Sequence, residues 1–198
     1  LNVGSPEIAF SLHQYPAAGV GLVREEFIIS NFIKIHPLAL LNKDSLNKGL
    51  QDKIDYHIRG YNTGEDYFIN KLAFGLSRIA SVFNPKPIIV RFSDFKSNEY
   101  SDLIGGEIYE PKEENPMLGW RGASRYYSKE YEEAFGMECK AILKARNECG
   151  LTNIIVMIPF CRTPKECQKV LETMAKYGLK RGENGLKVYI MCEIPSNV

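Results

Sequence analysis

The sequence predicts an α/β protein built on a parallel sheet, in which apolar strands alternate with amphipathic helices. Short apolar runs rich in β-branched residues, such as Ile88–Val90 and Asn153–Ile158, indicate buried strands. Between such runs, apolar residues recur at helical spacing, as Leu46, Leu50 and Ile54 do. Strands that alternate with helices in this way are typical of parallel βαβ units.

Composition narrows the class of protein further. With 198 residues, 44% of them hydrophobic and 25% charged, the chain can form one globular core. Lys and Arg number 25 against 24 Asp and Glu, so the net charge of +1 favours neither a nucleic-acid partner nor a membrane surface. No apolar segment approaches the ~20 residues of a membrane span, and no cleavable leader is recognisable. A cytoplasmic location is therefore the default expectation.

The first third of the chain predicts two strands and a helical insertion. Residues 1–4 form a strand tail, and Gly19–Val23 form a second strand that ends in Arg24. Because Arg24 occupies the third glycine position, the segment is not a GxGxxG dinucleotide motif. A helix between these strands is expected to start at Ser5. Helices over 27–41, 45–58 and 66–83 then form an insertion after the second strand.

Several arginines follow predicted strands in the middle of the chain. The third strand ends in Arg91, and Asp94 follows it; a glycine-rich acidic loop then leads to a short expected strand over 118–122. Arg121 lies in that strand and Arg125 shortly after it. Several guanidinium groups that follow strands would suit a phosphate or carboxylate ligand. On the residues alone, ordinary surface ion pairs remain an alternative.

The last third predicts two more strands, which makes six in all. A long helix over 128–149 is followed by the strand 153–158, and Thr163–Glu166 is a capping box that starts another helix. The final strand, 187–192, is followed directly by Glu193. Carboxyl ends of parallel strands meet at one rim, so Glu193 is expected near the arginines, where it could hold Mg²⁺. A solvated Glu193 is the alternative.

Three long motifs carry a family resemblance. RFSDFKSNEY, IGGEIYEPKEENPMLGWRGASRY and KRGENGLKVYIMCEIPSN closely resemble the carboxy-terminal barrel of the phosphoenolpyruvate synthase family, the pyruvate, water dikinases. The resemblance covers residues 1–198. It implies one domain that binds phosphoenolpyruvate (PEP) and pyruvate, folded as an incomplete TIM (β/α)8-type barrel with about six of eight strands. The five cysteines form no CxxC pair and are expected to be reduced structural thiols.

The resemblance also implies a reaction and a site. Enzymes of this family are phosphotransferases with paired acceptors, which move phosphate from ATP to a histidine on another domain and then to pyruvate, giving PEP, AMP and phosphate. Arg24, Arg91 and Arg121 match the residues that bind the substrate and the transferring phosphoryl group. Glu193 matches a substrate-site residue that is one of two carboxylate ligands of Mg²⁺. Glu26 and Asp94 match positions that would orient the arginines.

Parts of the family pattern are not found in this sequence. The second carboxylate ligand of Mg²⁺, a proton-donating cysteine, the phosphohistidine motif and an ATP-binding domain have no match. We therefore expect a truncated barrel, inactive alone, with the phosphohistidine and ATP-binding domains as partners and two open sheet edges that favour homo-oligomers. The alternatives are a related pyruvate, phosphate dikinase, the first enzyme of the sugar phosphotransferase system, or a non-catalytic binding or scaffold module.

Overall fold

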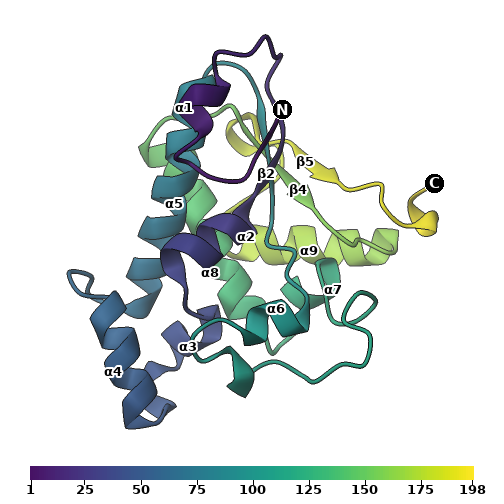
Figure 1. Ribbon diagram of the computed structural model, residues 1–198. Coiled ribbons are helices and arrows are strands. Elements are labelled where there is room, and N and C mark those ends of the chain that lie inside the picture. Colours follow the sequence, from purple (N-terminus) through teal and green to yellow (C-terminus); the bar gives the residue numbers. More distant parts are fainter.

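The structure, a computed structural model, describes residues 1–198 and confirms the α/β class. Five strands alternate with helices along the chain (Figure 1). In order, the elements are β1 (Asn2–Val3), α1 (Ala9–Leu12), β2 (Val20–Arg24), α2 (Glu25–Ile28), a π-helix (Ile29–Ile33), α3 (Pro37–Leu41), α4 (Lys48–His57), α5 (Gly64–Phe83), β3 (Ile88–Arg91), α6 (Ser97–Ser101), α7 (Ala123–Tyr126), α8 (Glu132–Leu143), a second π-helix (Lys144–Glu148), β4 (Ile154–Ile158), α9 (Pro164–Lys176) and β5 (Val188–Ile190).

All five strands form one parallel sheet in the order of the chain, β1-β2-β3-β4-β5. The register places Arg24 beside Arg91, so the last residues of β2 and β3 are neighbours. Arg91 in turn lies beside Met157 of β4. Side chains in register on parallel strands point to the same face. The sheet therefore brings two of the sequence-predicted arginines together.

The two faces of the sheet differ in burial. Ile88 and Val90 of β3 and Val156 of β4 are fully buried, whereas the alternating Ile89 and Ile155 are only half-buried. Figure 1 shows α5 and α8 running together beside the strands, and α4 projecting away from them at the lower left. One face of the sheet thus belongs to the main core, and the other is partly open.

The expected strand over 118–122 is wrong, so the sheet has five strands and not six. Side chains, rather than a neighbouring strand, bind this backbone: the Trp120 N–H donates to Glu113, and Arg162 donates to the Gly119 carbonyl at 3.3 Å. Gly122 adopts a φ of +61°, where an added Cβ would lie 2.5 Å from the Pro159 carbonyl oxygen. A loop closed by side chains and glycine replaces the strand.

The helices lie where the sequence predicts them, but several begin at other residues than predicted. Thr163 accepts a hydrogen bond from the Glu166 N–H at 3.2 Å, as the capping box predicts. The first helix begins at Ala9 and not near Ser5. The long helix expected over 128–149 begins only at Glu132. None of the helices has the length and apolar character needed to cross a membrane.

Candidate functional site

A cavity of about 690 Å³ opens where β2 and β3 end. The side chains that line it include five of the sequence-predicted residues: Arg24, Glu26, Arg91, Asp94 and Arg121. The register of β2 with β3 brings the first four together, because Glu26 follows β2 and Asp94 follows β3. Arg121 reaches the same cavity from the loop before α7. Two strand ends and a loop thus form one polar cavity.

Arg91 is held by two carboxylates. Its Nη2 donates to Glu26 Oε1 at 2.5 Å, and its Nη1 lies 3.1 Å from Asp94 Oδ2. The Glu26 carboxylate also accepts the Asp94 N–H at 2.8 Å, which fixes the turn after β3. Burial raises the pKa of Glu26, and the nearby Arg91 charge opposes that shift. Glu26 therefore orients both the guanidinium and the backbone beside it.

Arg121 shares the carboxylate of Asp94 with Arg91. Its Nε and Nη2 lie 2.7 Å and 3.1 Å from the two Asp94 oxygens, so the pair is bidentate. The guanidinium also stacks over the Phe160 ring, 4.1 Å from its centroid. An aromatic face and a two-point ion pair leave the planar group little freedom. Both arginines are thus preorganised by one buried aspartate.

Arg24 differs from the other two arginines because no carboxylate pairs with it. Its guanidinium lies 4.4 Å above the Phe27 ring, and the residue is exposed. Phe27 lines the same cavity. A cation that has only an aromatic partner keeps its donors available for an anionic ligand.

Glu193 lies outside this cavity. It follows β5, where its Oε1 accepts the Phe160 N–H at 2.7 Å, and the residue is exposed. Phe160 also stacks on Arg121, so one residue separates Glu193 from the arginine cluster. No three His, Cys, Asp or Glu side chains lie close enough together to hold a metal ion. The structure therefore leaves Glu193 at a neighbouring strand end and does not join it to the other predicted residues.

A buried carboxyl pair beneath the cavity was missed by the sequence analysis. Glu25 and Glu138 are both fully buried. Glu138 accepts the Ser93 N–H at 3.1 Å and the Ser93 hydroxyl at 2.6 Å, and burial raises its pKa to about 7. Burial and the adjacent Glu138 charge raise the pKa of Glu25 well above its usual range. The sequence signal that could have revealed this pair is Glu138, a glutamate within the apolar stripe of α8.

Arg125, which we expected to join the arginine group, is instead part of the core. It is fully buried, and its two Nη atoms lie 2.6 Å and 2.7 Å from the Glu110 oxygens. The Trp120 ring covers the guanidinium at 4.0 Å. Glu110 also accepts a hydrogen bond from His36 at 2.9 Å. This cluster holds the 105–125 loop against the helices, and none of its residues lines the cavity that contains Arg24, Arg91 and Arg121.

Comparisons with known proteins give the family. The model of the PEP-binding domain of PEP-utilising enzymes matches residues 1–198. Phosphoenolpyruvate synthases of Synechocystis sp., Aquifex aeolicus and Escherichia coli are 57%, 51% and 50% identical to this chain and match all of it. The chain spans 24%, 28% and 25% of those three proteins, about a quarter of each. The chain therefore belongs to the PEP-binding domain family of PEP-utilising enzymes.

Proposed function

We propose that this chain is the pyruvate- and PEP-binding domain of a phosphoenolpyruvate synthase. The whole protein would convert ATP, pyruvate and water to AMP, PEP and phosphate, with the phosphoryl group carried by a histidine on another domain. One observation carries the proposal: Asp94 holds Arg91 and Arg121 at one cavity, where the unpaired Arg24 also lies. Relatives named phosphoenolpyruvate synthase favour this enzyme over the related dikinases. Its substrates make a cytoplasmic location the natural one.

Residues 1–198 would form one domain, an incomplete (β/α)8-type barrel. The half-open face of β3 and β4 supports this fold, since the inner face of a barrel is filled only when the remaining strands close it. β1 and β5 each pair with a single neighbour and leave an edge. Further strands, or a second copy of the chain, would cover these edges.

The three arginines would have different roles in binding the substrate. Arg91 and Arg121 are fixed in orientation, which suits them to the oxygens of a phosphoryl group whose charge spreads in the transition state. Arg24 has no competing carboxylate and would pair with the negative charge of the ligand. Glu26 and Asp94 would act through the arginines, because both of their carboxylates are engaged with guanidinium groups.

Glu193 fits one ligand of Mg²⁺, a metal that is commonly held by one or two carboxylates together with substrate oxygens and water. The residue is exposed, and it lies next to Phe160, which contacts Arg121. When bound there with the substrate, the ion would polarise the keto oxygen of pyruvate. The chain would supply Glu193 at the strand end, and the arginines would hold the substrate.

Calorimetric titration of the chain with oxalate, a planar analogue of the pyruvate enolate, tests the proposal. We expect saturable binding that Mg²⁺ strengthens, and at least a tenfold loss of affinity in Arg121→Gln. Glu193→Gln should weaken binding only when Mg²⁺ is present. Oxalate binding that is unaffected by Arg121→Gln, or no binding at millimolar oxalate, would rule out this site and favour a scaffold. ATP- and pyruvate-dependent AMP formation by the chain alone would contradict the expected division into domains.

A further inference from the structure

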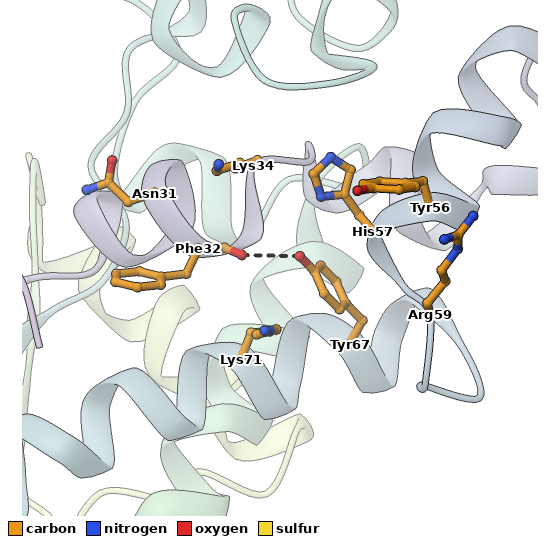
Figure 2. Close-up of a pocket in the computed structure, with 8 residues that line it drawn as sticks. All are labelled: Asn31, Phe32, Lys34, Tyr56, His57, Arg59, Tyr67 and Lys71. Atoms are coloured by element: carbon orange, nitrogen blue, oxygen red, sulfur yellow. Dashed lines mark hydrogen bonds between the residues drawn. The ribbon is translucent and has the colours of Figure 1, made fainter.

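A second cavity, of about 430 Å³, lies in the helical insertion between β2 and β3. Figure 2 shows the side chains that line it, which come from the first π-helix, the end of α4 and the start of α5. They are Asn31, Phe32, Lys34, Tyr56, His57, Arg59, Tyr67 and Lys71. None of these residues lines the first cavity, which contains Arg24, Arg91 and Arg121 and is called the arginine cavity below. The insertion therefore carries a site of its own.

The lining of this second cavity is cationic. Lys34, Arg59 and Lys71 contribute positive charge, and no carboxylate lines the cavity. Arg59 lies 4.7 Å above the Tyr56 ring, and Lys71 lies 5.9 Å from the centre of the Tyr67 ring. Because an aromatic ring carries no net charge, these contacts do not neutralise Arg59 or Lys71. Such a cluster concentrates anions locally, although the whole chain is almost neutral.

Three of the four acidic side chains on α4 and α5 form ion pairs outside the cavity. Asp52 pairs with Lys48 at 2.9 Å along the exposed side of α4. Asp55 pairs with Lys43 at 2.7 Å. Glu65, at the start of α5, pairs with Lys140 of α8 at 2.5 Å. Asp66, the fourth carboxylate of α4 and α5, makes no ion pair, but it does not line the cavity. Lys34, Arg59 and Lys71 therefore have no carboxylate partner.

The walls of the cavity are fixed by backbone contacts. The buried Tyr67 hydroxyl donates to the carbonyls of Phe32 and Ile33, and Figure 2 shows the first of these bonds. Lys34 adopts a left-handed backbone with φ of +66° at the end of the π-helix. Its N–H donates to Ile29 at 2.7 Å and its carbonyl accepts from Ile104 at 3.1 Å. Strained non-glycine backbone and π-helices are both frequent at functional sites.

We propose that this cavity is a second anion-binding site that takes a small phosphorylated molecule. Its donors come from three elements and approach from different sides, which suits a tetrahedral phosphate better than a planar carboxylate. In the view of Figure 2, Lys34 lies above and Lys71 below the hydrogen bond between Phe32 and Tyr67, and Tyr56 and His57 lie together at the upper right. The phosphate would lie between the two lysines, and its organic part would contact the aromatic side chains.

The site adjoins the arginine cavity through one continuous helical segment. Glu26 of α2 and Ser30 of the π-helix line the arginine cavity, whereas Asn31 and Lys34 line the second one. An occupant of the second cavity therefore contacts the helix that orients Arg91 through Glu26. The binding itself does not depend on the proposed catalytic role, and it can be measured without any turnover.

Titration calorimetry of the chain with inorganic pyrophosphate at low salt tests this site. We expect saturable binding that weakens at least tenfold in Lys34→Gln and in Lys71→Gln. Lys53→Gln is the matched control, because Lys53 is an exposed, unpaired lysine of α4 outside the cavity; it should change the affinity less than twofold. Arg24→Gln should likewise leave this binding intact. Unchanged thermal midpoints establish that the variants are folded.

Four results would overturn the proposal. One is the absence of saturable binding at millimolar pyrophosphate. Another is an equal loss of affinity in Lys53→Gln, which would show diffuse attraction to a basic surface rather than a site. The third is a loss of binding in Arg24→Gln but not in Lys34→Gln, which would assign the anion to the arginine cavity. Citrate provides the chemical comparison: affinity equal to that for pyrophosphate would contradict the preference for phosphate.

Discussion

Asp94 holds Arg121 through both of its carboxylate oxygens, at 2.7 Å and 3.1 Å from Nε and Nη2. The aspartate side chain is completely buried, and the arginine side chain is 12% exposed. The same carboxylate contacts Arg91 at 3.1 Å. One short side chain therefore determines how far apart two guanidinium groups stand, in a place where water screens their repulsion poorly.

Replacing this aspartate should affect stability and binding together. We expect Asp94→Asn to lower the free energy of unfolding by about 3–5 kcal/mol, because it leaves buried cations without their shared partner. Oxalate affinity should fall at least tenfold as the arginines separate. Urea unfolding and calorimetry measure the two effects. Asp102→Asn, an exposed carboxylate of the same cavity, is the control and should stay within about 0.5 kcal/mol. Equal stability of the two variants would contradict this role of Asp94.

Arg24 should contribute to binding without contributing to stability. Its guanidinium has no carboxylate partner and lies over Phe27, so Arg24→Gln should change the free energy of unfolding by less than about 1 kcal/mol. Oxalate affinity should nevertheless fall about tenfold. Arg78→Gln is the matched control, since Arg78 is also exposed and lies over an exposed ring, that of Phe74, and neither residue lines the cavity. The same loss of affinity in both variants would assign the effect to general charge.

The sequence predicted the parts of the site that depend on local patterns. Apolar runs predicted the strands, and Arg24 and Arg91 directly follow two of these runs. The two arginines lie side by side because parallel strands in register place their ends together. Thr163, the predicted capping residue, accepts a hydrogen bond at the start of α9. The residue pattern also named Arg121 and Asp94, and the family resemblance supplied their expected roles; their contact joins residues 27 positions apart.

Features that rest on distant contacts could not be predicted. The 118–122 segment has the apolar and aromatic residues of a strand, but side chains of Glu113 and Arg162 bind its backbone instead. Arg125 has the same local surroundings as Arg121, and only the distant partner Glu110 separates a core arginine from a site arginine. No local pattern encodes such pairings, because each depends on how the chain folds back.

The buried partner of Arg125 should be essential for folding of the loop. His36 accepts the Leu38 N–H at Nδ1, so its Nε2 donates to Glu110, and burial lowers the pKa of the histidine. Glu110 is thus the one carboxylate that offsets the Arg125 charge. Glu110→Gln should lower the free energy of unfolding by about 3–5 kcal/mol. The surface variant Glu65→Gln should lower it by less than about 1 kcal/mol. Similar losses in urea unfolding would show that Arg125 finds another partner.

The Glu25 and Glu138 pair should make stability depend on pH near neutrality. Glu138 accepts two hydrogen bonds from Ser93, whereas the Glu25 oxygens have no other partner, so Glu25 carries the proton that the two carboxyl groups share. Both pKa values are raised in the folded state, mainly by burial. The folded chain therefore holds protons that the unfolded chain releases above the usual glutamate pKa of 4.5.

The free energy of unfolding should consequently be highest below pH 4.5, considering this pair alone, and should decrease as the pH rises toward the Glu138 value of about 7. The Glu138 share of this decrease should be about 3 kcal/mol, and the raised pKa of Glu25 adds to it. Glu25→Gln supplies an amide that donates to Glu138 without titrating, so the decrease should shrink by at least half. Glu130→Gln, on the exposed surface, should leave it unchanged. Urea unfolding between pH 5 and pH 8 measures each slope, and parallel curves for the native chain and Glu25→Gln would show that the pair shares no proton.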